Sequence, residues 1–362
     1  MLHTKKLIPL AASALLLSML VGCGSGSDTV APPSSDTEET PPPVVEEITP
    51  PPYTGPINPL TGLPLTHGSV EDRPIAVMLN NLKVATPQQG NAQADIIYEV
   101  PAEGGITRML AVYQNTEEVG AIGSVRSSRP YYLELALGHD AIYLHAGGSP
   151  DAYSKIKTWN VTALDCVRGG YEGTLYWRDS ERRKSMGYEH SVLTSGKAIA
   201  KYFPDYNIRK THEEGYTYEM RFLEDAAPVS GLPAAQVTVP FSHYKTGVFD
   251  YDAATGRYLV SEYDAPYVDG NSGEQVACTN LLILKTSISM IPGDDKGRMS
   301  VDLSGSGEGW FACGGKYIPI TWEKSAPAGQ LRYALTDGTP LSLQCGNSYV
   351  CIVPNSTAVS FT

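Results

Sequence analysis

The segment Ile75-Ala76-Val77-Met78-Leu79 is entirely apolar, and Pro74 and Asn80 bound it. A short apolar run that contains β-branched residues and lies between Pro and polar residues is typical of a buried strand. Three further runs of this kind occur at residues 95–100, 109–113 and 141–145. Together these runs predict a sheet of buried strands.

Helical patterns lie among and after these strands. Residues 129–137 place apolar side chains at helical spacing behind Pro130, which suits the first turn of a helix. Residues 150–159 and 191–203 predict two more helices, and Pro204 ends the second of them. This alternation of strands and helices predicts a layered, mixed α/β domain over residues 57–215.

Helix signals disappear after about residue 216. Short strand-like runs replace them, and turn sequences such as Asp294-Asp295-Lys296-Gly297 and Asp337-Gly338 separate these runs. We therefore expect a β-rich domain over residues 216–362 and an α+β fold for the whole chain.

Composition and motifs restrict the classes of function. The 362 residues include 27 Lys plus Arg and 39 Asp plus Glu, which gives a formal net charge of -12. Because this balance offers no broad cationic surface for phosphates, we do not expect nucleic acid as a partner. The sequence has no Walker loop, no His-Glu-x-x-His segment and no Cys-x-x-Cys pair, so we expect neither a metal site nor a cofactor.

Residues 1–22 have the pattern of an export signal peptide. Lys5 and Lys6 precede the apolar residues 7–21, a run too short for a stable membrane span. The run ends at Gly22-Cys23, which resembles the bacterial lipobox, so we expect cleavage before Cys23 and acylation of its thiol with palmitate-like chains. An ordinary secretory signal with an unrelated cysteine is the alternative.

Residues 23–56 predict a stalk. They are rich in Ser, Pro and acidic residues and contain neither Lys nor Arg, so they lack the apolar residues of a core. Pro41-Pro42-Pro43 and Pro50-Pro51-Pro52 favour extended polyproline II structure, which makes the segment a semi-rigid spacer.

Several motifs in the predicted domains resemble one known family. They are Asn58-Pro59-Leu60-Thr61-Gly62, Glu103-Gly104-Gly105-Ile106-Thr107-Arg108, Gly123-Ser124-Val125-Arg126-Ser127-Ser128-Arg129 and His145-Ala146-Gly147-Gly148-Ser149-Pro150. In this order they resemble the YerB-like lipoproteins of Gram-positive bacteria, closely over residues 57–205 and more loosely beyond. The resemblance implies a two-domain protein on the outer face of the cell membrane, and it implies no established reaction. Glu189-His190-Ser191 departs from the family pattern.

Two arginines and two hydroxyls directly precede the predicted helix at residues 129–137. Arg126, Ser127, Ser128 and Arg129 could surround an anion, because guanidinium groups and the start of a helix both favour negative charge. A phosphate or carboxylate of an envelope polymer would fit such a pocket. The alternative is a helix cap made by Ser127 or Ser128, with the arginines paired to Glu99, Glu103 or Glu134.

Other titratable groups follow predicted strands. Glu99, Glu103 and Arg108 flank Gly104-Gly105, where the backbone can approach a ligand closely. The two carboxylates could act as acid and base, or could form ion pairs with arginines. His145 ends a predicted strand, where α/β sheets place their binding sites. It is either a catalytic candidate or a buried structural histidine.

Arg178 and Asp179 belong to an aromatic and charged stretch, Tyr176-Trp177-Arg178-Asp179. Aromatic faces stack on sugar rings and cations attract acidic groups, so this stretch is a candidate for ligand binding. A solvated surface loop is the alternative.

Cys345 and Cys351 are candidates for a disulfide. They would lie opposite each other if residues 347–349 formed a hairpin loop. The alternative is that they are small buried side chains.

These observations favour a lipid-anchored protein on the extracytoplasmic face of a Gram-positive-type cell membrane. Its first domain is expected to carry a polar cleft for an anionic or glycan ligand of the cell envelope. A wall-directed hydrolase or transferase that uses His145 or Glu103 is one alternative, and a protein-interaction platform is another.

Acylation of Cys23 is directly testable. Cells that express the chain and grow with radiolabelled palmitate are expected to label the wild-type protein and not the Cys23→Ala variant, because the variant lacks the acceptor thiol. Equal labelling of the two proteins would contradict the assignment.

Overall fold

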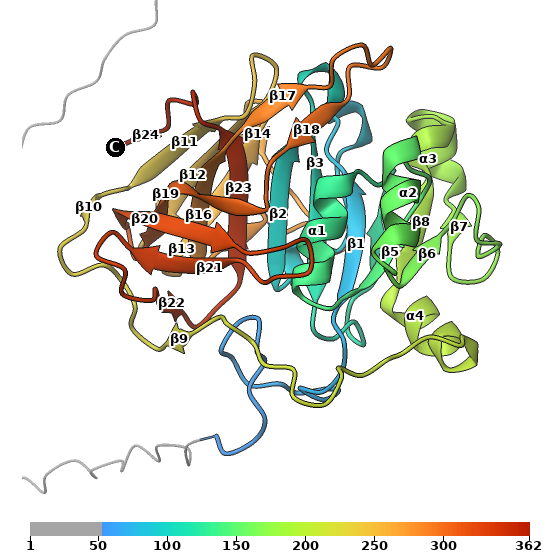
Figure 1. The fold of residues 1–362 in the computed structure, drawn as a ribbon, viewed down its shortest axis with the longest axis horizontal. Coiled ribbons are helices and arrows are strands. Elements are labelled where there is room, and N and C mark those ends of the chain that lie inside the picture. Colours follow the sequence, from blue (N-terminus) through green and yellow to red (C-terminus); the bar gives the residue numbers. More distant parts are fainter. Residues whose placement is uncertain (1–52) are drawn as a thin grey trace, which may run out of the picture. The chain divides into compact units, whose positions relative to one another are not determined.

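The computed structural model describes residues 53–362, whose centre is an 11-stranded sheet (Figure 1). The predicted signal peptide, Cys23 and the predicted stalk up to residue 52 lie outside the described residues. The strands of this central sheet are β1 (Ile75–Asn80), β2 (Ile96–Pro101), β3 (Thr107–Tyr113), β5 (Ile142–His145), β6 (Ala163–Asp165), β10 (Leu232–Pro233), β16 (Asn280–Thr286), β19 (Gly305–Cys313), β20 (Lys316–Lys324), β21 (Arg332–Leu335) and β23 (Ser348–Pro354).

Strands from both halves of the sequence make up the central sheet. Its order is β10, β20, β19, β16, β23, β2, β3, β1, β5, β6, and β21 pairs with β20. The two halves meet where β2 pairs in parallel with β23, in the register of Ile96 with Ser348. β23 also pairs in parallel with β16, whereas β3 is antiparallel to both β1 and β2. The predicted N-terminal and C-terminal domains thus share one continuous sheet.

Alternate residues of the central strands enter two separate apolar cores. In β1, Val77 and Leu79 belong to one core, and Ala76 and Met78 belong to the other. The same alternation holds in β3, β23 and β16. Because both faces are covered, these strands read as continuous apolar runs rather than as alternating ones. Each fully buried Val, Leu or Met side chain contributes about 1.5–3 kcal/mol.

Helices cover one face of the sheet beside β1 and β3. α1 contributes Tyr132, Leu133 and Ala136 to that core, and α2 contributes Ala152. Pro130 and Pro150 stand in the first turns of these two helices, where a missing backbone N–H costs nothing. Within residues 53–362 the four α-helices are α1 (Pro130–Gly138), α2 (Pro150–Thr158), α3 (Ser180–Ser185) and α4 (Gly196–Tyr202).

A six-stranded sheet and a three-stranded sheet contribute to the core on the opposite face, whereas two further strand pairs pack into the core on the helix side. Val237, Phe249 and Val260 of a six-stranded sheet pack into the same core as Val77 and Leu79. The strands of that sheet are β11 (Gln236–Pro240), β12 (Thr246–Asp252), β13 (Arg257–Glu262), β14 (Ala265–Pro266), β15 (Ala277–Cys278) and β24 (Ser360–Phe361). A three-stranded sheet consists of β4 (Ala121–Gly123), β7 (Trp177–Arg178) and β8 (Val192–Ser195), and two strand pairs are β9 (Phe222–Leu223) with β22 (Leu343–Gln344) and β17 (Ile288–Met290) with β18 (Met299–Val301).

The predicted fold class is confirmed: the chain is α+β, with a β-rich C-terminal half. The predicted helix over residues 191–203 is correct only from Gly196 onward. Residues 192–195 instead form β8, which pairs with β4 and β7, and the Ser195 hydroxyl caps α4 by accepting from the backbone N–H of Ala198. Within residues 53–362, no helix combines the length and the apolar character that a membrane crossing requires.

The shared sheet predicts that the N-terminal half depends on the C-terminal half. A chain that ends at residue 215 leaves the hydrogen-bonding edge of β2 unpaired and exposes the core face that β11, β12 and β13 cover. We expect this truncated chain to lack a cooperative thermal transition in calorimetry, and coexpression with residues 216–362 to restore it. A truncated chain that unfolds cooperatively within a few degrees of the full chain would refute this dependence.

Candidate functional site

Polar side chains gather where several strands of the central sheet end. β1, β5 and β6 are parallel neighbours, and they end at Asn80, His145 and Asp165. β2 runs in the same direction as β1, because both strands are antiparallel to β3. The carboxyl ends of such strands are where open α/β sheets bind ligands.

Glu103 holds two buried guanidinium groups at this edge. Its Oε1 accepts from Arg108 Nη2 at 2.7 Å and also from Arg129 Nη2, while its Oε2 accepts from Arg129 Nε at 3.2 Å. Burial acts to raise the pKa of Glu103, but the charges of Arg108 and Arg129 outweigh it and lower that pKa. The carboxylate therefore stays ionised, which makes it a weak proton acceptor.

Arg126 adds a third guanidinium to this group. Its Nη1 donates to the backbone oxygen of Glu189 at 3.0 Å and to Glu189 Oε2 at 3.1 Å, and the Glu189 side chain is 71% exposed. Burial lowers the pKa of Arg108, and the positive charges of Arg129 and Arg126 lower it further. The Nε atoms of Arg108 and Arg126 are buried and have no hydrogen-bond partner among the described residues. We call Arg108, Arg126 and Arg129 the arginine cluster.

The two serines between the arginines have structural partners. Ser127 Oγ donates to the backbone oxygen of Ala146 at 3.0 Å, and Ser128 Oγ accepts from Tyr143 OH at 2.9 Å. Neither serine caps the helix: the N-cap residue of α1 is Arg129, which makes no side-chain capping bond. The helix-cap interpretation of Ser127 and Ser128 is therefore wrong, because the chain stays extended for one residue longer than expected.

His145 is fully buried at the end of β5. Its Nδ1 lies 2.8 Å from the backbone oxygen of Gly147, and its Nε2 has no hydrogen-bond partner among the described residues. Burial lowers the pKa of His145 despite the nearby Asp165, so the ring is neutral at pH 7. Asp165 in turn accepts from the backbone N–H groups of Gly147 and Val167. This geometry holds the loop after β5 in place.

Arg178 lies beside the segment that binds Arg126. Its guanidinium stacks on the Tyr188 ring at 3.6 Å, and its Nη1 donates to the Tyr188 backbone oxygen. Tyr188 and Glu189 belong to one short 3-10 helix, Tyr188–His190, so Arg126 and Arg178 contact adjacent residues. Asp179 faces elsewhere, since its Oδ1 caps α3 by accepting from the backbone N–H of Arg182.

Glu99 does not pair with any of these arginines. It lies between the central sheet and the six-stranded sheet, where Lys245 Nζ approaches its Oε1 at 3.1 Å and Glu262 Oε1 at 2.8 Å. Burial raises the pKa of Glu262 to about 7. Lys245 and Glu262 are not among the residues predicted from the sequence, because only the packing of two sheets brings them to Glu99. The buried set of Asn81, Glu99, Lys245 and Glu262 is called the lysine cluster below.

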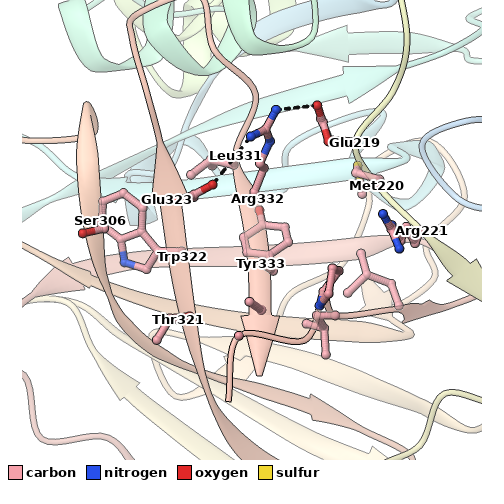
Figure 2. A pocket seen from close by; sticks show the side chains of 15 residues that line it. Glu219, Met220, Arg221, Ser306, Thr321, Trp322, Glu323, Leu331, Arg332 and Tyr333 are labelled. Atoms are coloured by element: carbon pink, nitrogen blue, oxygen red, sulfur yellow. Dashed lines mark hydrogen bonds and ion pairs between the residues drawn. The ribbon is translucent and has the colours of Figure 1, made fainter. Parts of the chain in front are cut away.

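Two cavities lie away from the arginine cluster or at its margin. One of about 560 Å³ belongs to the β-rich half, and there Arg332 bridges Glu219 and Glu323 beside Trp322 and Tyr333 (Figure 2). No residue singled out from the sequence lines it. The other cavity, of about 440 Å³, has Arg129, Tyr131, Ser149 and Trp159 in its lining, near the starts of α1 and α2.

The cysteine prediction needs a correction. Cys345 and Cys351 are both free thiols, and so are the other cysteines of residues 53–362. The predicted hairpin at residues 347–349 is absent because Ser348–Pro354 is one strand, β23, held by parallel partners on both sides. Within the same residues, no group of three or more His, Cys, Asp or Glu side chains is placed to hold a metal ion.

Comparison with known proteins identifies the class of this two-part α+β chain. Residues 60–209 match the N-terminal domain model, and residues 237–350 the C-terminal domain model, of a protein of unknown function, DUF3048. The chain belongs to this DUF3048 family. It is 31% identical over 312 residues to "Putative lipoprotein YerB" of Bacillus subtilis (strain 168). The matched region covers 84% of this chain and 88% of that protein.

A crystal structure of the YerB protein from Bacillus subtilis has a similar fold. It superimposes with a TM-score of 0.72 at 28% sequence identity, and the match covers 84% of this chain and 99% of that chain. The family resemblance expected from the sequence motifs is thereby confirmed.

The role of Glu103 as shared partner of two guanidiniums predicts the effect of its removal. Glu103→Gln leaves buried arginine charges without a carboxylate, so the free energy of unfolding should fall by about 3 kcal/mol. Glu189→Gln is the matched control, and because Glu189 is exposed the loss should stay below about 1 kcal/mol. Denaturant titration of the three proteins measures both values.

The same residue predicts a pH dependence. Because folding lowers the pKa of Glu103, its contribution is complete above the unfolded-state pKa and is lost as pH falls through the folded-state pKa. The wild-type chain should therefore lose more stability than Glu103→Gln on acidification. Parallel acid unfolding curves for the two proteins would contradict the assignment.

Proposed function

We propose that this chain is a lipid-anchored protein of the cell envelope that binds phosphate- or carboxylate-bearing ligands through the arginine cluster. The export signal, Cys23 and the relative named as a lipoprotein support the anchor. The position of Arg108, Arg126 and Arg129 at the carboxyl ends of parallel strands supports the binding role. The extracytoplasmic face of a Gram-positive-type membrane is part of the same proposal.

The charge balance of the arginine cluster carries the proposal. Three guanidiniums face one enclosed carboxylate, Glu103, and one exposed carboxylate, Glu189. An exposed ion pair contributes only about 0–1 kcal/mol, so a ligand anion can displace Glu189 from Arg126 at little cost. The guanidinium of Arg126 could then bind a phosphate or carboxylate through two parallel hydrogen bonds.

Aromatic groups nearby favour a ligand that also contains sugar. Tyr188 stacks on Arg178 and directly precedes Glu189, which Arg126 contacts. Tyr131 and Trp159 line the cavity of about 440 Å³ that Arg129 borders. Aromatic rings pack against the apolar faces of sugars, and cations beside them select acidic substituents. An anionic glycan or a sugar-phosphate polymer of the envelope combines both features.

The enzymatic alternative has less support. His145 is fully buried, and Arg108 and Arg129 engage the carboxylate oxygens of Glu103 and lower its pKa, so neither group is presented to a substrate as an effective general base. For the alternative of a protein-interaction platform, we identify no specific surface in its favour among residues 53–362. Binding therefore remains the function that the geometry supports best.

The binding proposal is tested with defined polymers. A glycerol phosphate oligomer and a polygalacturonate serve as the phosphate and carboxylate probes for the full chain in calorimetric titrations. Arg126→Gln should weaken binding by about tenfold or more, because one charge-assisted contact is lost, and should reduce the salt dependence. Arg332→Gln removes a comparable arginine from the β-rich half and should leave both unchanged.

Two results would reject the proposal. One is equal affinity and equal salt dependence of wild type and Arg126→Gln. The other is the absence of binding to either probe by a wild-type chain that unfolds cooperatively. Turnover of a probe that His145→Ala abolishes, with binding retained, would favour the enzymatic alternative.

A further inference from the structure

The lysine cluster joins groups from four distant parts of the chain. Asn81 directly follows β1, Glu99 lies in β2, Lys245 directly precedes β12 and Glu262 ends β13. The side chains of Glu99 and Lys245 are 0% exposed, and Asn81 and Glu262 are also buried. A lysine in such a position is unusual, because lysine ammonium groups are almost never buried without close partners.

The lysine amine and the asparagine amide contact the same two oxygen atoms. Asn81 Nδ2 lies 2.9 Å from Glu99 Oε1 and 3.2 Å from Glu262 Oε1. Lys245 Nζ lies 3.1 Å and 2.8 Å from these same atoms. Lys245 Nζ and Asn81 Nδ2 therefore contact the same pair of carboxylate oxygens, one from Glu99 and one from Glu262.

Neighbouring groups fix the asparagine in this position. Asn81 Nδ2 also donates to Thr107 Oγ1 at 2.9 Å, and the Asn81 backbone oxygen accepts from Tyr263 OH. The Asn81 Oδ1 atom and the Glu262 Oε2 atom are buried and have no hydrogen-bond partner among the described residues. If Glu262 Oε2 carries a proton, that atom becomes a hydrogen-bond donor, whereas Asn81 Oδ1 remains an acceptor.

The charges of the lysine cluster favour a shared proton. Two ionised carboxylates and one ammonium would leave a net negative charge in an interior that also contains the Phe241 and Tyr263 rings within 5.5 Å of Lys245 Nζ. Burial, and secondarily the charge of Glu99, raise the pKa of Glu262 against the opposing effect of Lys245. Burial acts to lower the pKa of Lys245, but the charges of Glu262 and Glu99 outweigh it and raise that pKa, so Lys245 stays an ammonium until it passes a proton to a carboxylate. Glu262, whose pKa is about 7, can hold and release a proton near neutral pH.

We propose that Lys245 and Asn81 form an intramolecular isopeptide bond. In this reaction Lys245 transfers one ammonium proton to Glu99, and its free amine attacks Asn81 Cγ. The new bond joins Nζ to Cγ, and the bond between Cγ and Nδ2 breaks. Glu262 gives its proton to the departing nitrogen and receives the second proton of the attacking amine, so one molecule of ammonia leaves. No oxidant, reductant or other reactant is required.

The reaction removes the buried charges that the folded chain otherwise carries. Before it, Lys245 is a cation and Glu99 an anion; afterwards the lysine nitrogen is an amide and both carboxyl groups are protonated. Enclosed charges carry a desolvation penalty that their mutual attraction repays only in part. Lys245 Nζ and Asn81 Nδ2 each lie within 3.2 Å of the same two carboxylate oxygens, so the amine and the amide share one enclosed space, and this confinement favours a reaction between them.

The bond would connect the two halves of the chain. Asn81 lies within the matched segment 60–209 and Lys245 within the matched segment 237–350. It would tie the central sheet to the six-stranded sheet by a link that neither reductant nor denaturant breaks. This inference is independent of ligand binding, since no member of the arginine cluster takes part.

Mass spectrometry of the full wild-type chain tests the proposal. The folded protein should be lighter by one ammonia than the mass calculated for its processed and acylated chain, and digestion should yield one branched peptide that joins the Asn81 and Lys245 segments. The branched peptide is decisive, because cyclisation of an asparagine to a succinimide also releases ammonia but links no second segment. Recovery of both segments only in unlinked form from the folded wild-type chain overturns the proposal.

Substitutions then assign the roles. Lys245→Met and Asn81→Ala remove the reacting groups, and Glu262→Gln removes the proton carrier while it keeps the side-chain shape. All three variants should show neither the loss of one ammonia nor the branched peptide. Lys324→Met is the matched control: Lys324 is also buried, but its Nζ donates to the backbone oxygens of Ala326, Pro327 and Gly329 and meets no asparagine. This control should retain the branched peptide, and its loss there would contradict the assignment.

Discussion

Hydrogen bonding between β2 and β23 is the constraint on which the remaining structure depends. It places residues about 250 positions apart side by side, as the contact of Tyr349 OH with Glu99 Oε2 shows. With this pairing in place, one continuous sheet runs through both matched segments, and each of its faces acquires a core. Parallel pairing at such a separation forms only after a large part of the chain has been ordered. The two halves therefore form one compact structural unit over residues 53–362.

Local patterns predicted much of this architecture. Strands that are buried on both faces consist of continuous apolar residues, so their sequences are easily recognised. The predicted runs at residues 75–79, 95–100, 109–113 and 141–145 correspond to β1, β2, β3 and β5. Residues 191–203 were misassigned because a short strand, Val192–Ser195, leads directly into α4, and a run of so few residues fits either periodicity. No local sequence pattern predicted that β2 pairs with β23, because the two strands lie about 250 residues apart.

The candidate site also has one part that the sequence predicts and another part that it does not predict. Glu103 and Arg108 are close in sequence, so their pairing could be anticipated, and Arg129 completes it from the start of α1. Lys245 could not be anticipated, since a lysine in a strand-rich region ordinarily lies on the surface and only tertiary packing encloses it. The arginine cluster and the lysine cluster both place charged side chains in the interior of the protein. Such groups cost stability unless their partners are well placed, so they are expected where function or specificity requires them.

The free thiols have a practical consequence for studying this protein. Of the five cysteines in residues 53–362, four are buried and only Cys345 has partial access to solvent. Among these five thiols, a maleimide dye should therefore attach at Cys345 in the β-rich half, provided that Cys23 is acylated or removed. Because none of these thiols is committed to a bridge, the chain can also be produced in a reducing cytoplasm without reshuffling. Fluorescence anisotropy and distance measurements thus become accessible without engineering a new attachment point.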